Sequence, residues 1–235
     1  MKKIFIVIAL ILCAAMLSAV MTSCDSQSKK SSETATESGE TASEAENAED
    51  ISENMTAEEI LNDLKVKQEH TIDFENDLTL QGTSVVNVEN GVLDVTTSAT
   101  DEDRMITKQS FSIPFKVDIT AKTDNSNIRF NYNNGEIILG WEAQPNVLSV
   151  RDIGENQSYT YDGKGGITVG EYAEISWIIH NDYMALIVDG EVRNYSVKYP
   201  YILAGAEKIQ AAPFEFGTAW NSTLSVSELK ITELE

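Results

Sequence analysis

The sequence predicts an all-β fold for residues 69–235, built as a two-sheet antiparallel β-sandwich. Short runs rich in Val, Ile, Thr, Tyr and Phe alternate with polar residues, and Gly, Asn and Asp separate these runs. Asn90-Gly91 and Asp189-Gly190 are dipeptides typical of tight hairpin turns. No apolar pattern of helical period is longer than two turns in this region. Regularly spaced strands joined by polar turns are typical of a sandwich.

Alternation within the runs assigns side chains to the two faces of each expected strand. Ile128, Phe130 and Tyr132 alternate with Arg129 and Asn131. Because successive side chains of a strand point to opposite faces, Arg129 and Asn131 must line the face opposite to Phe130. If Phe130 belongs to the core, the arginine and the asparagine lie on an outer sheet face.

The order of the expected strands is similar to that of the concanavalin A-like lectin/glucanase jelly roll, which includes laminin G-like domains. The similarity rests on segments 71–74, 88–95, 105–108, 115–122, 172–179, 185–191 and 224–231. It implies a jelly-roll topology in which the closing strand pairs with the opening one. Because this fold serves both lectins and hydrolases, the resemblance leaves the function open.

Residues 1–24 are expected to form a lipoprotein export signal. Lys2 and Lys3 precede an apolar run over residues 4–20, an arrangement typical of secretory signals. Residues 21–24, Met-Thr-Ser-Cys, resemble the box at which bacterial lipoprotein signals are cleaved. The resemblance implies a diacylglycerol thioether on Cys24, which would anchor the chain to the cell membrane and leave the rest outside the cytoplasm. The run is also long enough for an uncleaved membrane helix, which would have the same consequence.

Residues 25–55 are expected to be a disordered acidic linker. Ser, Thr, Ala, Glu and Asn dominate it, and such a composition buries too little apolar surface to fold. An inert spacer and an interaction tail both fit this pattern. Residues 56–68 are predicted to hold one short helix, because Thr56 and Glu59 form a capping-box pattern ahead of apolar residues at near-helical spacing.

Charge and residue counts exclude several classes of function. The formal net charge of −21 repels phosphates, so nucleic acid is not an expected partner. Cys13 and Cys24 are the two cysteines, so residues 25–235 hold no disulfide and no thiolate metal site. The histidines, His70 and His180, are far apart in sequence and neither suggests a nucleophilic triad. The Glu-x-Asp-x-Glu run of the resembled glucanases is absent, so an enzyme is the less favoured interpretation, with Glu142 and Glu215 as candidate acids.

Sandwich lectins bind sugars by stacking aromatic rings on them and by hydrogen bonding their hydroxyls. The candidate ligand-binding residues are Arg129, Asn131, Tyr132, Trp141, Glu142, Arg151, Tyr199, Tyr201 and Trp220. Apolar alternation around Trp141 and Trp177 favours core positions for both. Trp220 lies in a loop-like segment, so the sequence favours neither an exposed nor a buried position for its side chain.

Laminin G-like domains often hold calcium with loop Asp and Asn residues, so the resemblance makes segments 101–103 and 124–127 possible calcium ligands. Turns rich in these residues are also common without any metal. No other cofactor or metal is predicted. The favoured function is a lipid-anchored surface module that binds a carbohydrate or wall polymer. The alternatives are a structural or protein-interaction domain of a surface complex and, less favoured, a glycoside hydrolase.

Overall fold

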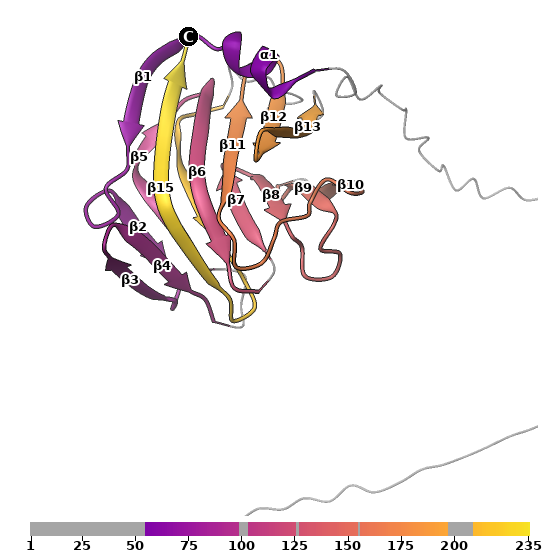
Figure 1. Cartoon of the computed structure of the whole chain (residues 1–235). Helices are drawn as coiled ribbons and strands as arrows, with labels where there is room; N and C mark the ends of the chain where they lie inside the picture. The colour runs from indigo at the N-terminus through magenta and orange to yellow at the C-terminus, as the bar shows by residue number, and fades with distance from the viewer. Residues whose placement is uncertain (1–54, 99–102, 126, 155, 197–208) are drawn as a thin grey trace, which may run out of the picture. The chain divides into compact units, whose positions relative to one another are not determined.

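The computed structural model describes residues 55–98, 103–125, 127–154, 156–196 and 209–235, which form one helix and fifteen strands (Figure 1). The predictions for Cys24, for residues 25–54 of the linker, for Asp101 and Glu102 as calcium ligands, and for Tyr199 and Tyr201 concern positions outside these described residues. No helix among the described residues has the length and apolar character needed to span a membrane.

Sheet A has eight strands in the order β13-β12-β11-β6-β15-β4-β3, and β1 pairs with the C-terminal part of β15. All its pairings are antiparallel. The strands are β1 (Val66–Thr71), β3 (Val85–Glu89), β4 (Val92–Thr96), β6 (Phe115–Thr123), β11 (Ala173–Ile179), β12 (Met184–Val188), β13 (Glu191–Ser196) and β15 (Thr223–Leu234).

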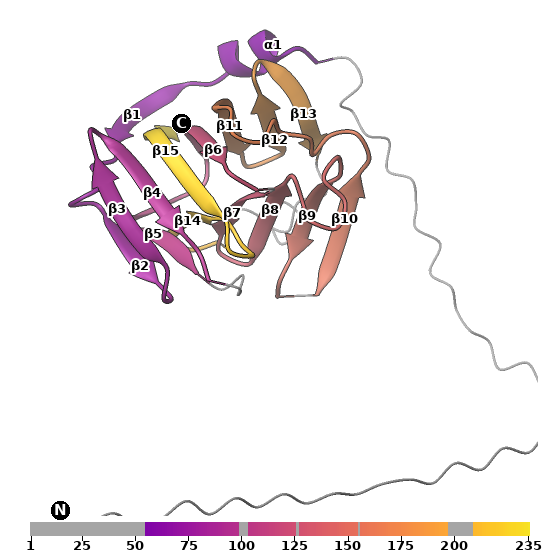
Figure 2. The same cartoon turned by 60° about the horizontal axis from the view of Figure 1, so that its bottom comes forward.

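Sheet B has seven antiparallel strands in the order β10-β9-β8-β7-β14-β5-β2. The strands are β2 (Leu78–Gln81), β5 (Arg104–Phe111), β7 (Ile128–Tyr132), β8 (Gly135–Leu139), β9 (Leu148–Asp152), β10 (Gln157–Tyr161) and β14 (Ala212–Gly217). The prediction of a two-sheet antiparallel sandwich is therefore confirmed (Figure 2).

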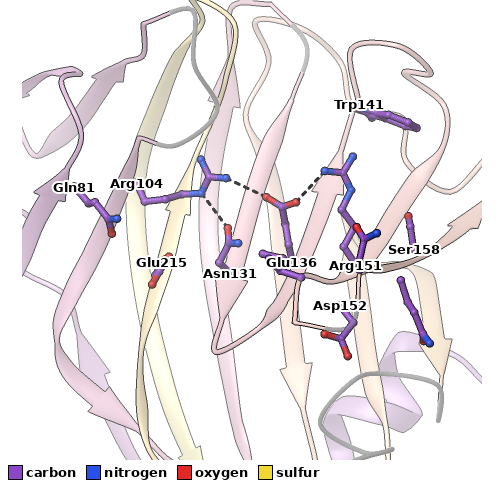
Figure 3. A pocket seen from close by; sticks show the side chains of 12 residues that line it. Gln81, Arg104, Asn131, Glu136, Trp141, Arg151, Asp152, Ser158 and Glu215 are labelled. Atoms are coloured by element: carbon purple, nitrogen blue, oxygen red, sulfur yellow. Dashed lines mark hydrogen bonds and ion pairs between the residues drawn. The ribbon is translucent and has the colours of Figure 1, made fainter.

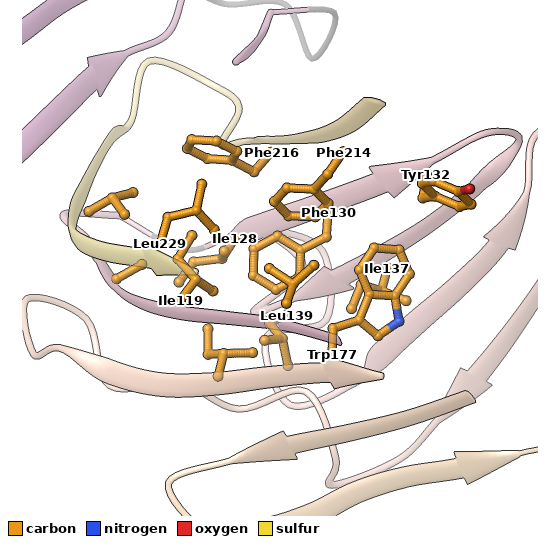
Figure 4. Packing of buried hydrophobic residues seen from close by; sticks show 14 of the residues in the cluster. Ile119, Ile128, Phe130, Tyr132, Ile137, Leu139, Trp177, Phe214, Phe216 and Leu229 are labelled. Carbon is orange, nitrogen blue, oxygen red and sulfur yellow. The ribbon is translucent and has the colours of Figure 1, made fainter. Parts of the chain in front are cut away.

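The core fills the space between the two sheets (Figure 4). Phe130 of β7 and Trp177 of β11 stack with ring centroids 6.1 Å apart, and Phe214 of β14 lies 6.1 Å from the same indole. Aromatic contacts of this kind add to the burial of apolar area. Because Phe130 is in the core, Arg129 and Asn131 are on the outer face of sheet B, as the alternation predicted.

Two hairpins close with the dipeptides that the sequence indicated. Asn90 and Gly91 have φ angles of 53° and 79°, and Asp189 and Gly190 have φ angles of 51° and 77°. Two consecutive left-handed residues match the right-handed twist of the flanking strands, which is why Asn-Gly and Asp-Gly are favoured there. These turns fix the β3–β4 and β12–β13 pairings.

The N-terminal helix is shorter than the predicted range 56–68. Helix α1 (Ala57–Asn62) begins with the predicted capping box, in which the Thr56 hydroxyl accepts from the Glu59 amide at 3.2 Å. The following residues form β1, which pairs with β15 from Val66↔Leu234 to Thr71↔Lys230. Pairing with the final strand satisfies their backbone groups and overrides the local helical pattern, so the sandwich starts before residue 69.

Candidate functional site

A cleft of about 730 Å³ lies over the outer face of sheet B and extends from β2 to β10 (Figure 3). Its lining is mostly polar and consists of Gln81, Arg104, Asn131, Glu136, Trp141, Arg151, Asp152, Ile153, Asn156, Gln157, Ser158 and Glu215.

One row of polar residues crosses five adjacent strands of this face. Glu215 of β14 pairs with Asn131 of β7, which pairs with Glu136 of β8. The row continues through Arg151 of β9 to Ser158 of β10. Each of these residues alternates along its strand with side chains that face the core, so all five project outward. The antiparallel register therefore brings together residues that are far apart in sequence.

Glu136 is the centre of a buried ion-pair network on this floor. Its carboxylate is 3.0 Å from an Arg104 Nη2, 3.3 Å from an Arg151 Nη1 and 3.7 Å from an Arg129 Nη1. The residue is only 4% exposed. Arg104 also donates through Nε to the Asn131 side-chain oxygen at 3.1 Å. Buried charges require such partners, and the network holds these side chains in fixed positions.

Arg104 reaches Asn131 and Glu136 because Gly217 leaves room beside it. Gly217 is the β14 residue that pairs with Arg129 of β7. A Cβ at position 217 would lie 2.9 Å from the Asp103 carbonyl oxygen and 3.5 Å from the Arg104 Cδ. The first distance is too short for a methyl group, so any side chain there displaces the segment that carries Arg104.

We expect Gly217→Ala to lower the free energy of unfolding by about 1–3 kcal/mol, the usual cost of overpacking. Urea denaturation of the two forms measures this difference. Gly166→Ala is the matched control, because the nearest atom to a Cβ there is 3.4 Å away and the substitution also restricts the unfolded chain. Equal stability of Gly217→Ala and the parent chain would show that the segment carrying Arg104 tolerates the extra methyl.

A second ion pair borders the network. Arg129 donates through Nη2 to the Glu142 carboxylate at 3.0 Å and through Nε to the Asn127 side-chain oxygen at 3.0 Å. Asn127 in turn donates to Glu142 at 2.6 Å. Since Arg129 also contacts Glu136, the two clusters form one continuous charged floor.

Trp141 forms the aromatic part of the cleft. The Arg151 guanidinium carbon lies 5.3 Å from the centre of its indole ring, within the range of a cation–π contact. Two backbone hydrogen bonds to Gly165 hold the ends of the loop that contains Trp141. The Gly140 amide donates to the Gly165 carbonyl oxygen at 2.7 Å, and the Gly165 amide donates to the Asn146 carbonyl oxygen at 3.0 Å. A side chain at Gly165 would overlap the Val147 backbone, so this close approach requires glycine.

Glu215 differs from the other acids of the cleft. Its carboxylate is half-buried and forms no hydrogen bond or ion pair with any described residue. Burial raises the pKa of this carboxyl, and the charge of Arg104 opposes that rise only in part. An unpartnered acid in a cleft is a group that a ligand can satisfy.

The structure brings together five of the nine residues predicted to bind a ligand. Asn131, Trp141 and Arg151 line the cleft, and Arg129 and Glu142 are in its charged floor. Tyr132 is a correction: it is fully buried, and its hydroxyl donates to the Phe111 carbonyl oxygen at 2.6 Å. It shares its strand face with Phe130, so its ring packs in the core and cannot stack on a sugar.

The three tryptophans occupy different environments. Trp177 is in the core, as the alternation favoured, whereas Trp141 lines the cleft. Trp220 is 53% exposed in the turn between β14 and β15, with a left-handed φ of 61°, and is not among the residues that line the cleft. It therefore serves as an internal reference for Trp141.

Sequence reasoning missed Arg104, Glu136 and Gln81 as site residues. A charge alternating with core side chains marks an outward position, and Glu136 before Ile137 fits that pattern. No local pattern shows that Arg104 of β5 reaches across β14 and β7 to meet Glu136 of β8, because this contact depends on the strand order.

Several of the possible calcium ligands bond to other groups of the protein. Asp103 accepts from the Ser84 hydroxyl at 2.6 Å and from the Thr83 amide at 3.1 Å, and these bonds lower the pKa of its carboxyl. Asp124 accepts from the Thr223 amide at 2.7 Å. Within the described ranges no group of three His, Cys, Asp or Glu side chains could hold a metal ion.

No protein-family model and no curated protein matches this sequence. Solved structures are similar. One is a sialidase, with a TM-score of 0.51 and 8% identity, and the similar region covers 72% of this chain and 19% of that one. Another is an endo-acting O-glycanase of the human gut microbiota that initiates mucin breakdown, with a TM-score of 0.51, 13% identity and coverage of 73% and 100%. At these identities the similarity establishes the fold alone, and that fold is the concanavalin A-like jelly roll.

Proposed function

We propose that this domain is a carbohydrate-binding module whose ligand lies in the cleft over sheet B. The observation that supports the proposal most directly is the charged floor centred on Glu136, held under an open, mostly polar cleft with Trp141 on its lining. Burying charges on the outer face of a sheet is costly, and a ligand that needs fixed hydrogen-bond partners gives a reason for it.

The chemistry of the lining suits a polyhydroxylated ligand. The side-chain amides of Gln81 and Gln157 and the hydroxyl of Ser158 offer both hydrogen-bond donors and acceptors, and the carboxylate of Glu215 offers acceptors. Trp141 offers an aromatic surface of the kind on which the apolar face of a sugar ring packs. Lining residues on both outer strands, β2 and β10, also suit an extended chain.

The proposal includes a location at the outer surface of the cell membrane. A lipid on Cys24 would tether the chain, and the acidic segment 25–55 would act as the spacer between membrane and module. A single acyl chain binds membranes only marginally, so stable anchoring requires the second chain of a diacylglycerol. Mass spectrometry of the purified membrane-bound chain tests this, because an unmodified Cys24 rules out the lipid anchor.

Trp141→Ala is expected to weaken glycan binding about ten-fold, corresponding to about 1.4 kcal/mol, through loss of the stacking surface. The full chain in detergent is run on affinity gels containing laminarin, pullulan, galactomannan or levan. Calorimetry then measures the affinity for the polymer that retards it.

Trp220→Ala is the matched control, because it removes an exposed indole away from the cleft. It should leave the affinity unchanged. Loss of binding in Trp220→Ala but not in Trp141→Ala would move the site to the β14–β15 turn. Retention on none of the four polymers, together with capture of a surface protein, would favour a protein-interaction domain instead.

Glycoside hydrolysis is a second candidate, favoured by one observation. Glu215 and Glu136 are outward residues separated by a single strand, which places their backbones about 10 Å apart. Their side chains could approach the separation of an inverting acid pair. Release of reducing ends from the retained polymer, abolished by Glu215→Gln, would establish hydrolysis; no release from the parent chain excludes it for that polymer.

A further inference from the structure

We propose that the cleft selects neutral or amine-bearing glycans over anionic ones, and that Glu215 sets this selection. The inference rests on the proposed carbohydrate binding and names the class of ligand. It follows from which charges of the cleft are already paired within the protein and which are not.

The guanidinium groups are engaged by protein acceptors. Arg104 bonds to Glu136 and Asn131, and Arg151 bonds to Glu136 while packing on Trp141. The Arg104 side chain is 9% exposed, so an incoming carboxylate, sulfate or phosphate would have to replace a buried ion pair in order to bind its guanidinium. The Arg151 side chain is 28% exposed, and an anion there would compete with Glu136 for the same guanidinium. Replacing such a pair is costly because it leaves the displaced Glu136 carboxylate buried without its partners.

The remaining charge of the lining is negative. Two arginines, Arg104 and Arg151, face three acids, Glu136, Asp152 and Glu215. The formal charges of these five residues sum to −1, and among the acids Glu215 has no hydrogen-bond or ion-pair partner among the described residues, whereas Glu136 pairs with both arginines. Partial exclusion of water strengthens repulsion between an anionic ligand and these groups.

Glu215 is the acid best placed to discriminate between ligands. Its register partner on β7 is Asn131, whose side-chain oxygen accepts a hydrogen bond from Arg104, and its register partner on β5 is Ile106. Its two carboxylate oxygens accept no hydrogen bond from any residue that the structure describes, so they are open to O–H or N–H groups of a ligand. A hydroxyl or an ammonium satisfies them, whereas a carboxylate or a sulfate leaves them unsatisfied and adds repulsion.

The test compares chemically matched pairs of probes. Laminarin, pullulan and galactomannan are used before and after oxidation of their primary hydroxyls to carboxylates, and chitosan serves as the amine-bearing probe. Affinities of the full chain, Glu215→Gln and Glu89→Gln are measured at low salt. Glu89→Gln is the control, because it removes the same charge in the β3–β4 hairpin of sheet A.

Glu215→Gln is expected to fold. Its carboxyl has a raised pKa, so the ionised form lowers stability as pH rises through the unfolded and then the folded pKa. Replacing it should therefore raise the melting temperature at pH 7 and give little gain at pH 4. This measurement separates a change in selection from a loss of fold.

The parent chain should bind the best native polymer about ten-fold more tightly than its oxidised form, and Glu215→Gln should remove most of this ratio while Glu89→Gln keeps it. Equal affinity of the parent chain for both forms, or an unchanged ratio in Glu215→Gln, overturns the selection while leaving carbohydrate binding intact. Absence of binding to every probe, chitosan included, overturns the proposed function and the selection with it.

Discussion

Glu136→Gln is expected to lower the free energy of unfolding by about 3–5 kcal/mol, the usual result of removing one partner from a buried ion pair. The amide that replaces the carboxylate carries no charge, so Arg104, Arg129 and Arg151 would share a poorly solvated space without their common counter-ion. Urea denaturation followed by far-UV circular dichroism measures the loss. The same variant should bind glycan weakly, because the floor of the cleft is no longer fixed.

Glu142→Gln is the control for this prediction. Glu142 also pairs with an arginine, but its side chain is 21% exposed against 5% for Glu136. Water can compensate for part of the change there, so a loss of about 1 kcal/mol or less is expected. If Glu136→Gln and Glu142→Gln were equally mild, Glu136 would not be the centre of the network. Restoration of stability by a second substitution, Arg151→Gln, would identify the uncompensated guanidinium as the cause.

The fold was predictable because its signals are local. Alternation in 128–132 gave the faces of β7, and Asn90-Gly91 and Asp189-Gly190 gave two of the hairpins. The same alternation placed Tyr132 with Phe130, so the sequence already argued against Tyr132 as a ligand-binding residue. Tyr132 was predicted to bind a ligand because its side chain is aromatic, although its strand face indicated a core position.

The site was only partly predictable because it depends on strand order. Glu215, Asn131 and Glu136 come from three strands, and β14 lies between β5 and β7 although it is the penultimate strand of the chain. No spacing in the sequence shows that Glu215 and Asn131 are direct partners, or that Gly217 leaves room for Arg104. Local patterns gave the outward faces, and only the register of non-local pairs combines them into one floor.

A chain that begins at residue 69, the start of the sandwich expected from sequence, is expected to be about 5 kcal/mol less stable than a chain that begins at residue 55, because it loses buried apolar area. It lacks α1, whose Ile60 is 1% exposed and belongs to a buried cluster with Ile178, Ala185, Ile187 and Leu234 of sheet A. Uncovering these side chains exposes a large apolar area to water, at about 25 cal/mol per Å². It also lacks the first half of β1, so the last residues of β15 lose their neighbour.

Because the total stability of a domain is only about 5–15 kcal/mol, the chain that begins at residue 69 should be largely unfolded or should melt at a much lower temperature. Point variants separate the helix contact from the strand contact. Ile60→Ala should cost about 2–4 kcal/mol by opening a cavity, whereas Leu61→Ala, on the exposed side of the same helix, should cost less than about 1 kcal/mol. If the melting temperatures of the two chains differed by only a few degrees, α1 and the first half of β1 would contribute little to the stability of the sandwich. The expected large difference would instead make them part of the sandwich, with the folded unit beginning at the capping box of Thr56 and Glu59.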